Sequence, residues 1–464
     1  MARRTAATSD APRPELAFLV IGLVFGLMLI FVNPPFQSND EDRHFYNSYF
    51  VSTGQIPPRQ QGNMIGGLLP VSVLDTSASL QGIAFASGAK VSEARIREAR
   101  RVPLAPTQQR FYDNPNYSLN PVPYLPFVAG IWMGRALDAG PIGILRFARL
   151  MGLLTFLALV FTAIRVMPVH KYVLMAVALT PTTLFQATSV TYDAASNALG
   201  FLILALCVSF ALRDAPLSNR ELGALVLLAV LHRFAKNGYF LIPFLYLLIP
   251  LRNVGSRLKW AGVLLCLVVA AVLPNLTWDP LIASLHLQGG QIFQNDFHFS
   301  PSEQLALYKD RPLELARYLF DNLRLQGKAW ITGALGRFGY SYVPLKDPAI
   351  LLHLIALLAI SVLDADARRS LSVFQKVVAF AVAAGTGVGI MLGFFLTSPL
   401  GAHVIFGLQG RYFVPVLPVL LLVNHNRSLL TPEWQRARRF VVPIYAALML
   451  GYTVNFLSTY FWRP

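Results

Sequence analysis

The chain has 464 residues, of which 55% are hydrophobic and only 13% are charged. Soluble globular chains carry about 25% charged residues, so this balance, with several apolar runs of about 20 residues, predicts a multi-spanning helical membrane protein. The net charge of +16 does not indicate a nucleic-acid partner, because the basic residues form short clusters between apolar runs, as the positive-inside rule predicts. We therefore expect contact with membrane lipid and none with nucleic acid.

Apolar runs predict an all-α chain with about eleven transmembrane helices. The candidate spans are Leu16–Val32, Ile142–Arg165, Tyr172–Val190, Ala194–Leu212, Leu222–Phe234, Tyr239–Leu251, Trp260–Thr277, Ala349–Leu363, Val377–Leu396, Gln409–Val423 and Phe440–Tyr460. With the N-terminus inside, every short internal loop carries Lys or Arg, as orientation requires. The segments Tyr239–Leu251 and Leu222–Phe234 could instead form one long helix, and we divide them at Asn237-Gly238.

This topology divides the chain into six parts. They are a cytoplasmic N-terminus (1–15), the first transmembrane helix (16–32), a long extracytoplasmic loop (33–141), transmembrane helices two to seven (142–277), a second extracytoplasmic loop (278–347) and helices eight to eleven (348–464). Both long loops are expected to carry interfacial helices. One of these is Asn120–Leu137, which is apolar enough to span but would invert the later topology.

Two further features concern processing and redox state. The first span resembles a signal peptide, but no A-x-A-like cleavage site follows it, so we expect it to stay uncleaved. Cys207 and Cys266 both lie inside apolar runs, which predicts buried free thiols and no disulfide.

An acidic stretch begins just after the first span, in "QSNDEDRHFYNSYFVSTG" (37–54). Ser38 followed three residues later by Glu41 has the form of a capping box, and Gly54 is a natural helix stop. On the predicted helix, Asp40 and Glu41 share a face with His44, and the helix N-terminus favours the ionised form of Asp40. An aromatic stripe predicts that this helix lies on the outer membrane surface, and it consists of Phe45, Tyr46, Tyr49 and Phe50.

Other ionisable residues lie at the outer ends of spans, which makes them functional candidates. They are Arg146, Arg149, Asp193, His232, Arg233, Lys236 and Arg411. Each of Lys236 and Arg411 lies within two residues of a glycine, Gly238 and Gly410 respectively, where a phosphate-bearing headgroup could approach the backbone. The alternative for these cations is snorkelling to lipid headgroups. Asp193 is expected to orient the acceptor or His44, or simply to cap the span that follows.

A set of motifs runs in order along most of the chain. They are "PPFQSNDEDRHFYNSYFVSTG", "NYSLNPVPYLP", "RFARLMG", "PTTLFQATSVTYDAASNALG", "AKNGYF", "GRFGYSYVPL" and "LQGRYFVPVLP". With these motifs the chain resembles a family of bacterial multi-spanning membrane proteins catalogued as a domain of unknown function, itself similar to GT-C-type glycosyltransferases. It departs from the family pattern at Asn39, Asn237 and Tyr340, none of which removes an ionisable group.

The resemblance implies a transferase that moves a sugar from a polyprenyl-phosphate-linked donor to a glycan or lipid-linked acceptor. It implies the bacterial cytoplasmic (inner) membrane, with the active site facing the periplasm or the exterior. The catalytic acid of the first external loop corresponds to Asp40, with Glu41 and His44 beside it. Substrate-binding roles then fall on Asp193, Lys236, Arg411, Arg149, Tyr412 and Gln409.

The residues fit this chemistry independently. Sugar transfer from a lipid phosphate needs a carboxylate to accept the acceptor proton and cations to stabilise the departing phosphate. A nucleotide sugar is not favoured, because no Gly-rich phosphate loop follows a strand pattern, and H-E-x-x-H and G-x-S-x-G protease motifs are absent. We assign no metal, and a divalent cation at Asp40, Glu41 and His44 stays an open alternative.

Two other activities stay open. A transporter or flippase of a lipid-linked sugar is favoured by the break at Lys236-Asn237-Gly238, but scarce midplane charge and the lack of visible repeats count against it. A glycan polymerase or ligase, which moves a whole oligosaccharide, is not separated from a single-sugar transferase by the sequence.

Overall fold

The structure is a computed structural model that describes residues 13–81, 88–114, 120–287, 299–366, 369–429 and 431–462. Most of the predicted cytoplasmic N-terminus therefore lies outside the described residues, as do positions 116–119 of the motif that ends at Pro126.

Most of the described chain is helical, which confirms the predicted class of helical membrane protein. The α-helices are α1 (Pro14–Val32), α2 (Glu41–Ser52), α3 (Val71–Gln81), α4 (Glu93–Arg101), α5 (Leu125–Ala136), α6 (Pro141–Val166), α7 (Lys171–Ala178), α8 (Pro181–Ala187), α9 (Tyr192–Ala211), α10 (Asn219–Ala235), α11 (Leu251–Val254), α12 (Arg257–Leu276), α13 (Trp278–Ser284), α14 (Pro301–Ala306), α15 (Pro312–Gly336), α16 (Asp347–Leu363), α17 (Val373–Leu396), α18 (Leu417–Leu421) and α19 (Pro432–Phe461). The 3-10 helices are η2 (Val122–Tyr124), η3 (Asn237–Tyr239), η4 (Ile242–Leu248), η5 (Gly410–Val416) and η6 (Leu422–Asn424).

Six helices in the described part of the chain are long and apolar enough to cross a bilayer. They lie in α1, α6, α9, the continuous α12–α13 segment, α17 and α19. Three shorter apolar segments, Asn237–Leu248, Asp347–Leu363 and Gly410–Asn424, run beside them. The total of eleven crossings, the domain bounds and the orientation stay predictions.

Several predicted spans are broken rather than continuous. The segment predicted as one span over Tyr172–Val190 is two short helices, α7 and α8, and Pro181 begins the second because proline fits the first turn of a helix. The segments predicted over Tyr239–Leu251 and Gln409–Val423 are largely 3-10 helix. Both contain prolines, whose missing N–H interrupts regular α-helical bonding.

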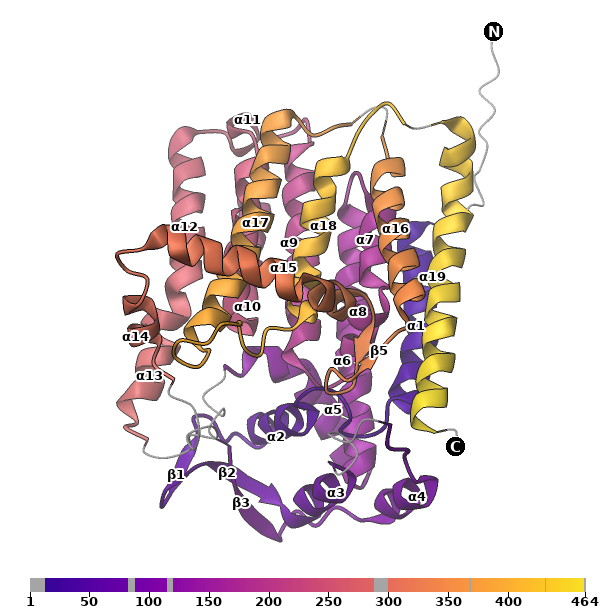
Figure 1. The fold of residues 1–464 in the computed structure, drawn as a ribbon, viewed down its shortest axis with the longest axis vertical. Coiled ribbons are helices and arrows are strands. Elements are labelled where there is room, and N and C mark those ends of the chain that lie inside the picture. The colour runs from indigo at the N-terminus through magenta and orange to yellow at the C-terminus, as the bar shows by residue number, and fades with distance from the viewer. Residues whose placement is uncertain are drawn as a thin grey trace.

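One end of the bundle is covered by the chain that follows α1 (Figure 1). It includes α2 to α5 and an antiparallel sheet of β1 (Arg59–Gln61), β2 (Met64–Pro70) and β3 (Gln109–Asp113). β2 pairs with both neighbours, with Gly66 opposite Arg59 and Asp113. Strands β4 (Arg337–Phe338) and β5 (Val343–Pro344) form a second sheet. The all-α prediction missed both of these small sheets.

Two helices position the candidate site without following the bundle axis. α5 forms a tight hairpin with α6, where Gly130 lies against the backbone of Ala148. α15 runs across the bundle in front of α17 and α18 (Figure 1). It packs on η5 and α8, so it holds chain segments that are far apart in sequence.

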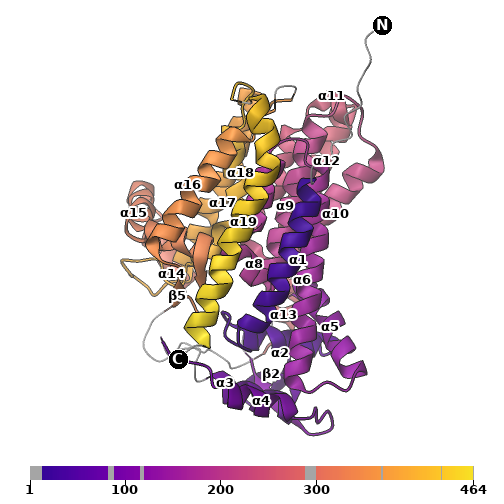
Figure 2. The same cartoon turned by 90° about the vertical axis from the view of Figure 1, so that its right-hand side faces the viewer.

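The first and last long helices lie side by side (Figure 2). The indole Nε1 of Trp462 donates to the carbonyl of Val32 over 2.7 Å, so α1 and α19 end at the same end of the bundle. Cys207 is buried as predicted, but Cys266 is exposed on α12, where the prediction of a buried thiol was wrong.

Candidate active site at the end of the bundle

The helix α2 begins at Asp40, which adopts a left-handed backbone conformation with φ of 53°. Its side chain is half-buried, and no other described residue forms a hydrogen bond or ion pair with the carboxylate. The predicted capping box is wrong, because Glu41 bonds elsewhere and only the backbone N–H of Glu41 reaches Ser38. The predicted surface location is also wrong, since nearly every side chain of α2 is buried.

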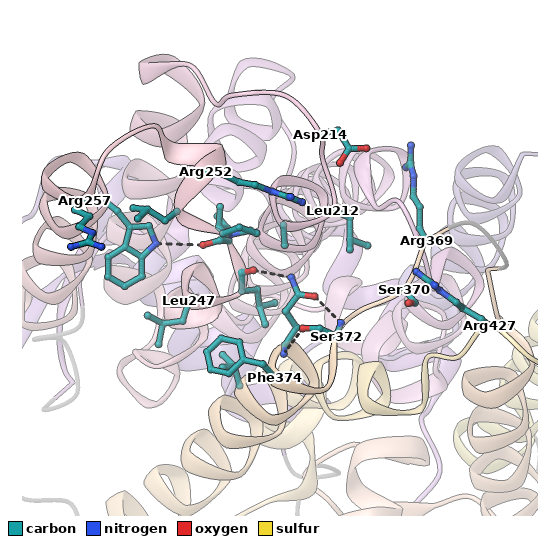
Figure 3. A pocket seen from close by; sticks show the side chains of 18 residues that line it. Leu212, Asp214, Leu247, Arg252, Arg257, Arg369, Ser370, Ser372, Phe374 and Arg427 are labelled. Atoms are coloured by element: carbon teal, nitrogen blue, oxygen red, sulfur yellow. Dashed lines mark hydrogen bonds between the residues drawn. The ribbon is translucent and has the colours of Figure 1, made fainter.

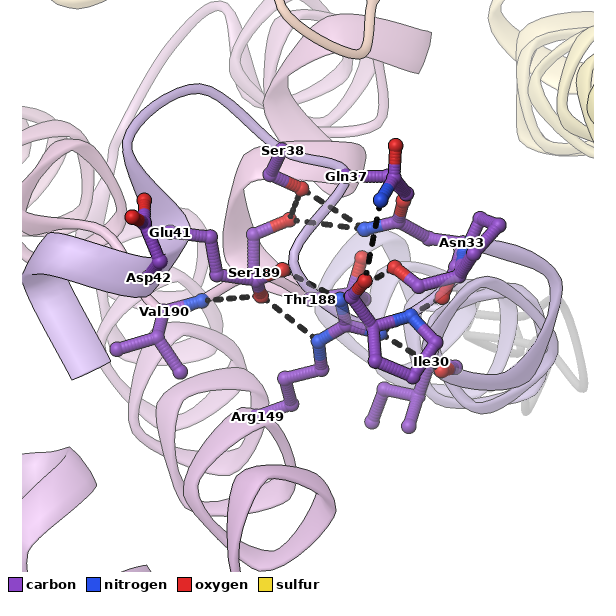
Figure 4. Close-up of polar contacts among 12 residues, drawn as sticks. Ile30, Asn33, Gln37, Ser38, Glu41, Asp42, Arg149, Thr188, Ser189 and Val190 are labelled. Carbon is purple, nitrogen blue, oxygen red and sulfur yellow. Dashed lines mark hydrogen bonds and ion pairs between the residues drawn. The ribbon is translucent and has the colours of Figure 1, made fainter. Parts of the chain in front are cut away.

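Glu41 is a buried ion-pair partner of Arg149 (Figure 4). The guanidinium donates from Nη2 to Oε2 over 2.5 Å and from Nε to Oε1 over 2.7 Å. The same guanidinium donates to the carbonyls of Ile30, Asn33 and Pro34, while the N–H of Val190 donates to Oε1 of Glu41. Both side chains are at most 1% exposed. This pair therefore joins the end of α1, the start of α2, α6 and the chain before α9.

Two further ionisable side chains of α2, Asp42 and His44, are buried. His44 Nδ1 lies 3.0 Å from the hydroxyl of Tyr124, and its ring meets Tyr192 edge-on. Burial lowers the pKa of His44 to about 4, although the charges of Asp40 and Asp193 oppose this shift. His44 is therefore neutral at pH 7. Asp42 accepts from Gln81 and from the Tyr340 hydroxyl, and burial raises the pKa of its carboxyl.

Asp193 binds both predicted phosphate-binding cations. Lys236 Nζ is hydrogen-bonded to Oδ1 of Asp193, and Arg411 Nε lies 3.4 Å from Oδ2. Asp193 lies in the first turn of α9, Lys236 follows α10, and Arg411 is the second residue of η5. All three side chains are at least 86% buried. Two cations against one carboxylate leave the cluster with one net positive charge.

Aromatic rings surround the Lys236 ammonium. It lies 3.9 Å from the ring centre of Tyr412, 4.6 Å from that of Tyr192 and 5.5 Å from that of Tyr239. Tyrosine faces attract cations through the ring quadrupole. Tyr412 is one of the predicted site residues, whereas Tyr192 and Tyr239 were not predicted. Tyr192 is next to Asp193 in the sequence, and Tyr239 is three residues from Lys236.

A cavity of about 530 Å³ opens beside this cluster. Its lining includes Lys236, Tyr412, Tyr192, Tyr124 and Gly238. The far wall comes from α12 and α17, through residues such as Pro274, Gly389 and Phe394. Cavities of this size hold small organic ligands.

Gln409 and Arg411 line a smaller cavity of about 140 Å³. The Gln409 carbonyl oxygen accepts from Asn39 Nδ2 and from the Ser341 hydroxyl, each over 3.1 Å. Arg337 lines the same cavity, and its buried Nε has no hydrogen-bond partner among the described residues. Arg337 was not among the predicted site residues, although it lies in the motif "GRFGYSYVPL".

The glycine beside Arg411 packs closely against helix α15. A Cβ on Gly410 would lie 1.8 Å from the carbonyl oxygen of Trp330, so its lack of a side chain admits helix α15. Gly410 also lines the 140 Å³ cavity with Arg411, so the approach of a headgroup at Gly410 stays a prediction. Gly238 differs, since it lines the 530 Å³ cavity and a Cβ there would meet only Ile390 at 3.5 Å.

The remaining ionisable candidates are placed outside the cluster. His232 is fully buried and stacks on Tyr239, and Arg233 donates to Ala271, Asn237 and Asn275. Arg146 lies over the ring of Phe31. Among the described residues no three His, Cys, Asp or Glu side chains converge as a metal site would require. Glu41, one of the three suggested ligands, is engaged by Arg149.

These features define a multi-spanning helical membrane protein with a buried charged cluster beside a cavity at one end of its bundle. The chain belongs to the family described as "Predicted membrane protein (DUF2142)", which matches residues 23–420. This confirms the predicted family. A solved structure of ArnT from Cupriavidus metallidurans, bound to undecaprenyl phosphate, is similar to the chain with 13% sequence identity and a TM-score of 0.43, over 96% of this chain and 77% of that one. No curated protein matches the chain significantly.

Proposed function

We propose that the protein is a membrane glycosyltransferase that uses a polyprenyl-phosphate-linked sugar, with the donor phosphate bound at Lys236 and Arg411. The observation that carries this proposal is the net positive charge of the Asp193–Lys236–Arg411 cluster. An unbalanced buried charge is costly unless a counter-charge compensates it. A phosphate entering the adjacent 530 Å³ cavity would supply that counter-charge.

The cavity suits a sugar as well as a phosphate. Its tyrosines present flat apolar faces and hydroxyl groups, which can pack on a sugar ring and hydrogen-bond to its edge. The apolar residues of α12 and α17 that form the far wall offer a surface for the first part of a polyprenyl chain.

Asp40 is the proposed general base. Its carboxylate has no bonded partner among the described residues, and it acts electrostatically on His44 together with Asp193. In the proposed step an acceptor hydroxyl attacks the anomeric carbon and its proton passes to Asp40. The bond between that carbon and the phosphate oxygen breaks, and the polyprenyl phosphate leaves with the electron pair, stabilised by Lys236 and Arg411.

Other predicted site residues take supporting roles in this proposal. Glu41 and Arg149 are buried against each other and hold the loop that carries Asp40. Neutral His44 orients Tyr124 and Tyr192 at the cavity wall. Gln409 holds Asn39, the residue before the base. The membrane in question is the bacterial inner membrane, with this end of the bundle facing outward.

The experiment is a transfer assay with the purified chain in lipid nanodiscs. A panel of decaprenyl-phosphate-linked hexoses and pentoses with radiolabelled sugars is offered with extracted envelope glycans and lipids as acceptors. We expect label to move to an acceptor from one donor and decaprenyl phosphate to be released in equal amount. Saturable binding of decaprenyl phosphate without any transfer across the panel would falsify the enzymatic role.

A transporter of a lipid-linked sugar is the second candidate, because two short 3-10 segments, η3 and η5, border the site. Broken helices of this kind form substrate sites in transporters. Movement of an intact labelled donor across a proteoliposome membrane, unaffected by Asp40→Asn, would favour it.

A further inference from the structure

A second cavity lies at the opposite end of the bundle from Asp193. Its volume is about 950 Å³, and Ala211, the last residue of α9, is part of its lining. Asp193 is in the first turn of the same 20-residue helix. At 1.5 Å per residue the helix is about 30 Å long, which matches the hydrocarbon thickness of a bilayer. The two cavities therefore lie at the depths of opposite leaflets.

The lining of this cavity divides into an apolar part and a basic part. The apolar part includes Leu247, Ile249, Trp260, Phe374 and Val378. The basic part consists of four arginines from three separate chain segments, Arg252, Arg257, Arg369 and Arg427. Figure 3 shows Arg252 and Arg257 on the side of α11 and α12, with Arg369 and Arg427 on the other side.

These four arginines form no ion pairs within the described residues, unlike other arginines at the same end of the bundle. Arg213 pairs with Glu221 at 2.5 Å, and Arg438 pairs with Asp364 at 2.7 Å. Within the described residues none of the four cavity arginines has an ion-pair partner. Asp214 is the one acidic side chain among the described residues that line the cavity, and within the described chain it forms no ion pair with these arginines.

We propose that this cavity binds the headgroup of a phosphate-bearing lipid from the leaflet opposite the candidate active site. Guanidinium groups bind phosphate through paired N–H donors. The apolar part would bury the beginning of the lipid chains, a feature that free phosphate does not require. Simple snorkelling explains basic residues at a span end, but it does not account for their position around a large partly apolar cavity. The site is independent of the transferase proposal.

Native mass spectrometry of the detergent-solubilised chain tests the site. Dioleoyl phosphatidylglycerol and dioleoyl phosphatidylcholine are supplied at equal concentration, and lipid retained per protein is measured. We expect preferential retention of the anionic lipid. Arg252→Gln/Arg369→Gln should lower that retention about thirtyfold, given roughly 1 kcal/mol for each of the two basic residues that contact an anionic headgroup.

The matched control is Arg220→Gln/Arg436→Gln, which removes the same charge from two exposed residues at this end that do not line the cavity. The control should retain lipid like the wild-type chain. Equal loss in both double variants would overturn the proposal, because general electrostatic attraction would then suffice. Displacement of the lipid by millimolar inorganic phosphate would overturn the lipid as ligand and assign the cavity to free phosphate.

Asp214→Asn provides a test that misfolding cannot imitate. Removal of the acidic group from the lining should raise retention of phosphatidylglycerol by about twofold to fivefold, as the loss of one screened like-charge repulsion implies. Unchanged or reduced retention in a variant that elutes normally from a sizing column would contradict the proposed position of the headgroup.

Discussion

Glu41 and Arg149 form a buried, bidentate ion pair. Arg149 Nη2 lies 2.5 Å from Glu41 Oε2, and Arg149 Nε lies 2.7 Å from Oε1. Neither side chain is more than 1% exposed, so each charge depends on the other. Removal of one partner from a buried pair leaves an uncompensated charge and costs about 3–5 kcal/mol.

Glu41→Gln is therefore expected to lower the apparent unfolding temperature strongly, as measured by thermal aggregation in detergent. The matched control is Asp75→Asn, which breaks an exposed pair with Arg110 at 3.0 Å and should change stability by at most about 1 kcal/mol. The double variant Glu41→Gln/Arg149→Met should recover part of the loss. Equal effects of the two single variants would show that the pair is not essential to the fold.

Asp40→Asn is expected to reduce sugar transfer about 100-fold or more without loss of stability. General-base contributions are of this size. The fold should tolerate the change because the carboxylate has no bonded partner among the described residues, and asparagine is one of the few residues that readily adopts the left-handed conformation seen at Asp40. Initial transfer rates and unfolding temperatures are measured together. A stable Asp40→Asn protein with normal rates would remove Asp40 from the chemistry.

Arg411→Lys is expected to weaken binding of decaprenyl phosphate by about tenfold or more. Arg411 contacts Asp193 and also donates from Nη2 to the Tyr412 hydroxyl over 3.3 Å, and lysine cannot reproduce this fork. Arg146→Lys is the control, because Arg146 lies over Phe31 outside the cluster. Its affinity should be that of the wild-type chain. Equal binding by all three proteins would make Arg411 a structural residue only.

His44 should make the stability of the folded chain fall in mild acid. Burial lowers its pKa from 6.5 to about 4, so the unfolded chain binds more protons between these values. The free energy of unfolding therefore rises with pH across this window and falls as the pH drops from about 6.5 to about 4. His44→Gln should show a smaller slope in unfolding temperature over the same range. Identical slopes would mean that His44 does not titrate as its buried position implies.

Gly410→Ala should destabilise the packing of η5 on α15. The new methyl group would overlap the Trp330 carbonyl, and overpacking of this kind costs about 1–3 kcal/mol. Gly238→Ala is the control, since its Cβ would make only an ordinary contact with Ile390. Unfolding temperatures should separate the two variants, and a normal value for Gly410→Ala would mean that α15 can shift freely.

Sequence patterns predicted the long spans well because length and apolarity are local properties. α1, α6 and α17 follow directly from such runs. The same patterns failed at α2, whose aromatic stripe indicated a surface helix. The Glu41 carboxylate of α2 is paired with Arg149, which is 108 residues away, and no local pattern contains that information.

Local sequence patterns identified single residues of the candidate site but not the contacts between them. Asp193, Lys236 and Arg411 were each identified from their position at the end of an apolar run. Their pairing with one another could not be predicted, because it depends on how α9, α10 and η5 meet in space. The close packing of Gly410 on Trp330 could not be predicted either, since Trp330 lies on a helix that crosses the bundle.

The separation of Glu41 from Arg149 also sets an order for membrane insertion. During synthesis the end of α1, the loop after it and the Glu41 carboxylate leave the ribosome more than one hundred residues before their shared partner. Until α6 enters the bilayer, three backbone carbonyls and one carboxylate near the membrane surface depend on water for their hydrogen bonds. The connection between α1 and α2 is thus completed by the guanidinium of Arg149, which is synthesised later, and truncation before α6 would leave α1 anchored but the segment around Asp40 unformed.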